Sequence, residues 1–245
     1  MDASTLLWLV VPGLATGIGG LFLLVVRRPG LRLIDTLLGT TAGIMLAAAV
    51  FSLLVPALAD GSVWEVVVGF VAGAATLAAL DATIPHLHAR IRERPVRGEE
   101  HRAALMLSAL AIHNVPEGLA VGVAFAAGGP ELGVPIAVAI GLQNIPEGFA
   151  AAAPLLATGA SLAAAVGFAV ATGLVEPPAA LLGYAIAESV TALLPLGLSF
   201  AAGAMVYVVV DEIVPESHGR GHEREATAGL VVGFAVMMLL DNALG

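Results

Sequence analysis

The sequence contains no cysteine and no lysine, and it is poor in charged and aromatic residues. Charged side chains make up 12% of the 245 residues and aromatic side chains 5%, whereas hydrophobic residues make up 59%. The lack of cysteine excludes disulfides, thiolate ligands and cysteine nucleophiles, so any metal must be held by nitrogen and oxygen. So apolar a composition is foreign to soluble domains and predicts an all-α, polytopic membrane protein, with no nucleic acid expected as a partner.

Apolar stretches account for nearly the whole chain. A membrane-spanning helix needs about 20 mostly apolar residues. Eight stretches satisfy this: Thr5–Val26, Leu37–Ala59, Trp64–Pro85, Ala103–Gly129, Leu132–Ala157, Ser161–Ala187, Val190–Val210 and Ala226–Leu244. The longest connector, residues 86–102, is too short for a soluble domain. We therefore expect residues 1–245 to form one integral membrane transporter domain, without a catalytic module.

The basic residues predict how the chain is oriented in the membrane. All ten are arginines in the first, third and seventh connectors, at positions 27, 28, 32, 90, 92, 94, 97, 102, 220 and 224. In an eight-helix chain these three connectors lie on one side. The positive-inside rule makes that side cytoplasmic. We expect residues 86–102 to be a cytoplasmic connector and both termini to lie outside a plasma membrane, the inner membrane in a bacterium.

Two related motifs place polar side chains inside apolar helices. HNVPEG at 113–118 returns as QNIPEG at 143–148, and GLVEPPAA follows at 173–180. The ionisable residues of these motifs lie ten or more residues from their helix starts, near mid-depth. An ionisable group there costs about 2.5–3.5 kcal/mol on insertion scales and is by default a functional hypothesis.

The spacing within each motif predicts that its polar side chains converge. Residues three and four positions apart share a helix face, so His113 and Asn114 face the same way as Glu117, and the second motif repeats this arrangement. A short turn near Gly128 and Gly129 makes the two helices antiparallel, so that the polar faces meet. The predicted cluster comprises His113, Asn114, Glu117, Gln143, Asn144, Glu147 and Glu176.

Proline adds polar backbone to this region. Pro116 and Pro146 lack an amide hydrogen and free the carbonyl four residues earlier, and Pro177 with Pro178 repeats the device after Glu176. Interrupted backbone at membrane depth is tolerated where it lines a buried or watery site.

A divalent cation would make the cluster tolerable. Three carboxylates in a dry interior cannot all stay ionised, because desolvation and like charges favour the protonated form. One imidazole with carboxylate and amide oxygens suits zinc, iron, manganese or cadmium, and carboxylates on facing helices can bridge two ions. The alternative interpretations are a proline kink with a satisfied carboxylate, and amide side chains that only join helices.

The motifs resemble those of the ZIP (Zrt/Irt-like protein) family of divalent metal transporters, and DATIPHLH at 81–88 is similar to its bacterial GufA-type branch. The resemblance implies eight helices in a 3+2+3 inverted-repeat arrangement, a binuclear site, metal flow into the cytoplasm and a homodimer. It assigns one ion to residues 113, 117, 143 and 147, and a second ion to residues 114, 117, 144, 147 and 176. Gln143 stands where the family often has histidine, and Asn144 where some relatives have aspartate. We therefore expect selectivity broader than zinc alone.

Other polar residues are candidates for the path of the ion. Asp81, His86 and His88 lie at the cytoplasmic end of the third predicted helix, and the resemblance makes them an exit path. Matching family positions suggest that Glu212 and Asp241 gate or accept ions. Solvated helix-end histidines and interfacial carboxylates are the competing interpretations.

These observations predict a transporter that carries divalent metal, zinc first and iron, manganese or cadmium as further substrates, by alternating access of a mid-membrane site. A divalent-cation channel is the nearer alternative. An intramembrane metallohydrolase is the more distant one, because the cluster has a single histidine and the chain has no HExxH helix. No enzymatic activity is expected.

Overall fold

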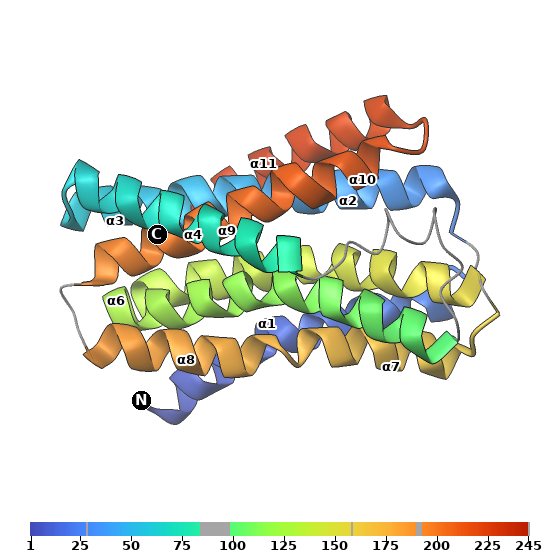
Figure 1. The fold of residues 1–245 in the computed structure, drawn as a ribbon, viewed down its shortest axis with the longest axis horizontal. Helices are drawn as coiled ribbons and strands as arrows, with labels where there is room; N and C mark the ends of the chain where they lie inside the picture. The colour runs from blue at the N-terminus through green and yellow to red at the C-terminus, as the bar shows by residue number, and fades with distance from the viewer. Residues whose placement is uncertain (28, 84–98, 158, 190–192, 245) are drawn as a thin grey trace.

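The computed structural model describes residues 1–245 except 28, 84–98, 158, 190–192 and 245 (Figure 1). The described residues form helices and turns and contain no strand. Seven of their helical stretches are long and apolar enough to cross a membrane. Many apolar side chains on these helices face outward, with Trp64 78% and Leu239 67% exposed. The expectation of an all-helical membrane protein is confirmed.

A side chain caps the start of the first span, and a buried ion pair lies near the start of the second. In α1 (Ala3–Leu21), which ends in the short 3-10 turn η1 (Phe22–Leu24), Asp2 accepts a hydrogen bond from the Thr5 amide at 2.8 Å. The helix α2 (Leu31–Ala47) begins before the predicted Leu37 and includes Asp35. Asp35 is fully buried but pairs with Arg220 at 2.6 Å, so the charge does not end the helix.

The helix α6 (Glu99–Ala157) contains the two motif segments and a reversal between them. Its backbone leaves the helical region at Gly128 and Gly129, where Gly129 has a φ of 59°, a conformation that favours glycine. The chain folds back there, and the two halves lie side by side (Figure 1). The predicted turn at these glycines is confirmed. Because α6 begins at Glu99, the last four residues of the expected connector 86–102 are helical.

The sixth predicted span is broken in two at the expected prolines. α7 (Leu162–Gly173) ends just before Glu176, and α8 (Glu176–Ser189) begins with it. Pro177 and Pro178 lack the amide hydrogens that would continue the helix. The glutamate therefore lies at a helix start inside the bundle.

Two further spans are interrupted in a different way, by a π-helical segment within a continuous helix. α2 passes through the π-helix η2 (Ala48–Leu54) into α3 (Val55–Asp60), and α9 (Leu194–Val208) passes through the π-helix η4 (Val209–Ile213) into α10 (Val214–His218). The sequence AGIM (42–45) precedes the first π-helix and AGAM (202–205) the second, and Val-Pro follows each. Such π-helical turns often occur at functional sites.

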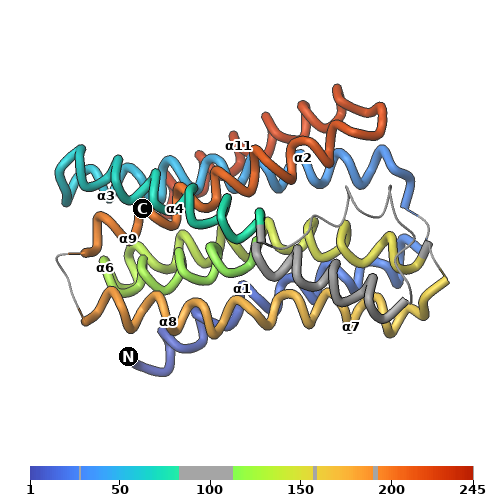
Figure 2. Tube along the Cα trace, in the orientation of Figure 1, coloured from blue at the N-terminus to red at the C-terminus, as the bar shows by residue number. Residues whose placement is uncertain are grey.

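The helices pack as two groups. α2 lies along α11 (Glu223–Leu244), and α4 (Val63–Thr83) lies along α9, whereas α1 packs on α6, α7 and α8. In Figure 2, α2, α4 and α11 lie above α6, and α7 and α8 lie below it. Glycines permit these close helix contacts. A Cβ added to Gly43 would lie only 2.0 Å from the backbone carbonyl oxygen of Leu230, and one added to Gly203 only 2.0 Å from that of Phe70.

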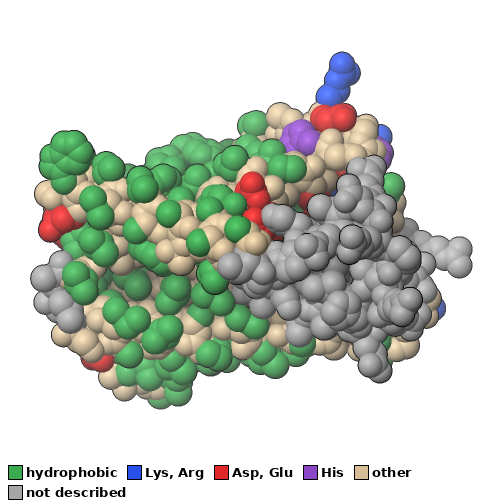
Figure 3. All heavy atoms as spheres, viewed as in Figure 1, with side chains coloured by type: hydrophobic (Ala, Val, Ile, Leu, Met, Phe, Trp, Pro, Cys, Tyr) green, Lys and Arg blue, Asp and Glu red, His purple; other side chains and the backbone are tan. Residues whose placement is uncertain are grey.

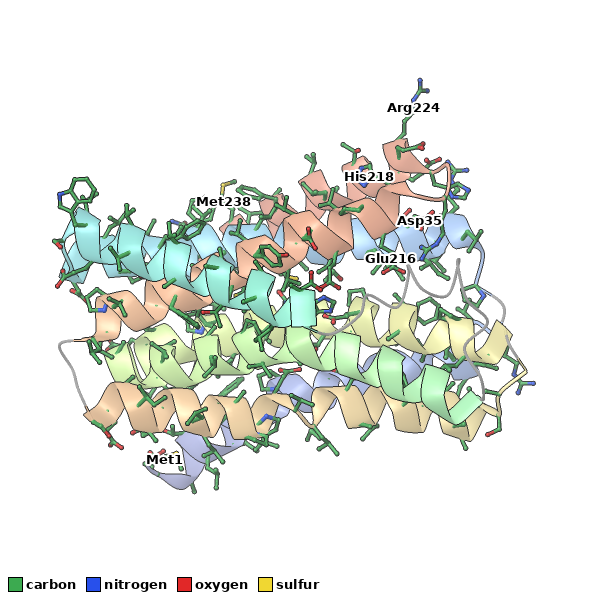
Figure 4. All side chains as sticks on the ribbon, in the orientation of Figure 1. Met1, Asp35, Glu216, His218, Arg224 and Met238 are labelled. Carbon is green, nitrogen blue, oxygen red and sulfur yellow. The ribbon has the colours of Figure 1, made fainter. Side chains whose placement is uncertain are left out.

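Charged side chains lie at both ends of the molecule and, in a small acidic group, near the middle of the visible face (Figure 3). Apolar side chains cover much of the visible face along the helices (Figure 3). Both termini lie at one end (Figure 1), and Asp35, Glu216, His218 and Arg224 lie at the opposite end from Met1 (Figure 4).

Candidate metal centre

The seven predicted ligands come from three helical segments and are buried together. Three lie on the first half of α6, three on its second half, and Glu176 is the first residue of α8. None of the seven is more than 7% exposed. The reversal at Gly128 and Gly129 brings the first two sets to one height, and the break before α8 adds the third.

Amide side chains connect the carboxylates of this centre. The Gln143 Nε2 donates to Glu117 Oε1 at 2.6 Å, which joins the two halves of α6. The Asn144 Nδ2 donates to Glu176 Oε1 at 2.7 Å and to the Pro12 carbonyl of α1 at 2.9 Å. Each amide thus donates through its nitrogen, whereas its oxygen has no hydrogen-bond partner.

The Glu147 carboxylate lies between the other charged groups. Glu147 is 6% exposed and has an oxygen without a partner, and it lies one helical turn from Gln143 and Asn144, whose amides bond Glu117 and Glu176. The three glutamates that the sequence placed at mid-depth therefore share one environment, with like charges close together.

Glu212 of η4 reaches this centre directly. Its Oε2 lies 2.6 Å from His113 Nε2, at ion-pair distance, although the ring N–H is not aligned on that oxygen as in a hydrogen bond. Glu212, which the sequence suggests for the path of the ion, thus contacts one of the predicted ligands from the span formed by α9, η4 and α10.

The centre holds most of the buried polar atoms that make no hydrogen bond in the described residues. Within the described residues, seven buried side-chain nitrogen or oxygen atoms lack a hydrogen-bond partner. Six belong to the predicted ligands and the seventh is Thr16 Oγ1. They are His113 Nε2, Glu117 Oε2, Gln143 Oε1, Asn144 Oδ1, Glu147 Oε2, Glu176 Oε2 and Thr16 Oγ1. Buried acceptors left unpaired are costly, and a cation is the group that can satisfy several at once.

The side chains do not yet form a metal cage. In the part of the chain that the structure describes, no three histidine, aspartate or glutamate side chains are arranged to hold one ion. The amides occupy one oxygen each of Glu117 and Glu176, and the other oxygen of each carboxylate has no partner.

Asp81 and Asp241, the other path candidates among the described residues, accept hydrogen bonds from residues outside the seven predicted ligands. The Tyr207 hydroxyl donates to Asp81 Oδ2 at 3.4 Å, and the Ser52 hydroxyl donates to Asp241 Oδ1 at 2.5 Å. Ser52 belongs to η2, so this pair joins a π-helix to α11. His86 and His88 lie outside the described residues.

A separate ion-pair network ties the α10–α11 turn to α2. Arg220 lies 2.6 Å from Asp35 Oδ1 and 2.5 Å from Glu216 Oε1, and His222 Nδ1 lies 2.9 Å from Asp35 Oδ2. Partial burial alone would lower the pKa of Arg220, but Asp35 and Glu216 raise it above its ordinary value. Arg220 therefore stays charged. From the sequence, Arg220 is expected only to set the topology, and no local pattern points to Asp35.

Comparison with known proteins identifies the chain's relatives. A family model described as the ZIP zinc transporter matches residues 85–241. The zinc transporter ZIPB of Bordetella bronchiseptica is 43% identical over 241 residues, which cover 94% of this chain and 78% of that protein. The chain belongs to the ZIP zinc transporter family. Among its ZIP relatives, the zinc transporter GufA of Myxococcus xanthus is 42% identical over 246 residues, 96% of this chain and 97% of that protein. The zinc transporter ZupT of Corynebacterium aurimucosum is 35% identical over 260 residues, 97% of each chain.

Membership of the ZIP family confirms the resemblance drawn from the paired motifs, including its GufA-type branch. The family is one of transporters, so the metallohydrolase alternative is set aside. The matched segment includes all seven predicted ligands and leaves out α1, which contributes the Pro12 carbonyl and Thr16 to the same region.

Proposed function

We propose that this protein carries divalent metal ions, zinc foremost, across a bacterial inner membrane into the cytoplasm. The observation that carries the proposal is the set of buried, unpartnered oxygens on five of the predicted ligands, two of which the Gln143 and Asn144 amides join to the second motif. The proposed ligands are the seven predicted residues, His113, Asn114, Glu117, Gln143, Asn144, Glu147 and Glu176.

Charge explains why a divalent ion suits the centre. Glu117, Glu147 and Glu176 are buried near one another, and both desolvation and mutual repulsion oppose their ionisation. Two positive charges offset these costs, and the amide oxygens complete the coordination. Glu117 and Glu147 belong to both ligand sets, which supports a binuclear site with these carboxylates as bridges.

Selectivity is proposed to extend beyond zinc to cadmium, iron and manganese. The centre has one imidazole, His113, and its remaining proposed ligands offer oxygen atoms, which harder ions accept. In a competition assay, each of these metals should reduce zinc uptake. Strict exclusivity for zinc contradicts this part of the proposal.

Eight spans in a 3+2+3 inverted repeat are proposed from the same architecture. The two halves of α6 count as separate spans, which adds one to the seven apolar stretches. The AGIM helix α2 packs on α11 and the AGAM helix α9 packs on α4, so the second helix of each proposed repeat contacts the third helix of the other. Arg224 lies at the opposite end from Met1 (Figure 4), which supports outward termini.

Alternating access is proposed to occur between the two helix groups. In one division of the 3+2+3 arrangement, the first and last three helices move against the central pair. The packing favours a different division, because α1, α7 and α8 are held closely against α6. A Cβ added to Gly118 would lie 2.4 Å from the backbone carbonyl oxygen of Glu176, and one added to Gly148 would lie 2.0 Å from the backbone carbonyl oxygen of Thr16. We infer that α1, α6, α7 and α8 move together against α2, α4, α9 and α11, with the His113–Glu212 contact made and broken.

The proposal is tested with purified protein in liposomes that contain a metal-sensitive dye. The intact protein should take up zinc at a rate that saturates with concentration, and Glu117→Ala and Glu147→Ala should abolish uptake. Uptake that does not saturate at low metal concentration indicates a channel. Unchanged uptake by Glu147→Ala, with unchanged metal binding, excludes the centre. The homodimer belongs to the proposal as well and is measured by the mass of the protein in detergent.

A further inference from the structure

The hydroxyl group of Thr16 is the one buried, unpartnered side-chain atom of the described residues that lies outside the predicted ligands. Thr16 is on α1 and is 2% exposed. It lies where α1 crosses the second half of α6 and the end of α7. A Cβ on Gly173 would lie 2.9 Å from Thr16 Oγ1.

Several other threonines in this protein satisfy their hydroxyls within their own helices, whereas Thr41 donates to the Gln143 carbonyl. The Thr40 hydroxyl donates to the carbonyl of residue 36 at 2.9 Å, and the Thr76 hydroxyl to that of residue 72 at 2.7 Å. This bond to the carbonyl four residues earlier is common for threonine in helices. Thr16 does not make it.

The reason lies at the carbonyl that Thr16 would use. Four residues before it is Pro12, whose oxygen accepts the Asn144 side-chain amide at 2.9 Å. That amide also donates to Glu176 Oε1 at 2.7 Å. The Thr16 hydroxyl therefore makes no bond to its own backbone. One turn of α1 earlier, a Cβ on Gly13 would lie 3.3 Å from Glu176 Cβ, so this face of α1 packs directly against Glu176.

We propose that Thr16 is a positioning residue of the metal centre, whose hydroxyl is reserved for the Glu176 carboxylate when that carboxylate turns toward the ion. This inference rests on the proposed function. The rearrangement takes Glu176 Oε1 from the Asn144 amide, and the hydroxyl supplies a replacement donor at the same carboxylate. Partners of this kind orient metal ligands, and their loss commonly weakens affinity by about 10- to 100-fold.

The experiment compares zinc binding by purified, detergent-solubilised protein with three variants. Thr16→Val keeps the shape but removes the hydroxyl, and it should weaken zinc binding by about tenfold. Thr16→Ser keeps the hydroxyl and should restore binding. Thr40→Val makes the same chemical change on α2, where the hydroxyl is satisfied by its own helix, and should bind zinc as the intact protein does.

Melting temperature provides the check on folding, and Thr16→Ala replaces Thr16→Val if the latter is unfolded. Equal affinity of the hydroxyl-free variant and the intact protein overturns the inference. So does a Thr16→Ser variant that binds as weakly as Thr16→Val, because the effect then comes from packing. If the intact protein itself binds no zinc, the proposed function fails instead.

Discussion

Asp35 at one end of the molecule and Glu147 at its centre are both buried carboxylates, and they differ in the cations and donors that reach them. Both oxygens of Asp35 are paired, one with Arg220 and the other with His222. Glu147 has an oxygen without a partner, and its neighbours include two further carboxylates.

The difference separates a structural charge from one that serves a ligand. Around Asp35 the protein supplies its own cation, so the charge is satisfied once the chain has folded. Around Glu147 the described residues supply carboxylate and amide oxygens without donors and one imidazole, which is why we propose that the centre takes its cation from outside. Burial and charge are similar in the two regions. The two regions differ in whether each carboxylate oxygen has a cationic or hydrogen-bonding partner.

The largest effect is expected from Glu147→Gln. This substitution removes a charge from a group of crowded carboxylates and keeps the shape, so the melting temperature of the metal-free protein should not fall. Zinc binding and uptake should both be lost. Isothermal titration with zinc, together with a melting curve in detergent, measures the two quantities.

Asp35→Asn provides the matched change in the other region. It should lower the melting temperature, because Arg220 loses one of its two carboxylate partners and His222 loses its own, while the zinc affinity of the folded protein stays the same. The comparison between the regions is wrong if Glu147→Gln destabilises the protein as much as Asp35→Asn does.

A smaller effect is expected from Arg220→Ala. Removing one partner of a buried ion pair costs about 3 kcal/mol at the lower end of the usual range, and the partial exposure of Arg220 favours that end. Unfolding in denaturant should show this loss, with zinc affinity unchanged. Arg224→Ala is the control, because Arg224 extends away from the protein (Figure 4) and its loss should have little effect. Equal losses for the two variants would show that Arg220 acts only through the net charge.

Much of the centre could be predicted from sequence because its signals are local. The spacing of HNVPEG and QNIPEG fixes which side chains share a face, and the Gly128–Gly129 turn brings the two faces together. The prolines after Glu176 predict the helix break that the structure contains. Apolar stretches of sufficient length locate most spans to within a few residues.

The contacts between distant segments could not be predicted in this way. A threonine within a run of small residues carries no local signal, and Thr16 stands out only because the Pro12 carbonyl is taken by Asn144. Asp35 lies in a polar stretch that hydropathy assigns to a connector, and only its pairing with Arg220, far along the chain, shows that the helix continues. The contact between Glu212 and His113 also joins residues that lie far apart in the sequence, so no local pattern predicts it.

The smallest effect is expected from Gln143→His, which tests how the centre discriminates between metals. Gln143 is fully buried and donates to Glu117 at 2.6 Å. An imidazole can keep that bond through one ring nitrogen and offer the other to an ion, and it suits zinc better than manganese. Zinc uptake should therefore resist competition by manganese about three- to tenfold better than in the intact protein. Gln143→Glu is the control, since it adds a harder oxygen and should not favour zinc. If both substitutions change the competition equally, the charge around Glu117 governs selectivity and the identity of the donor atom does not.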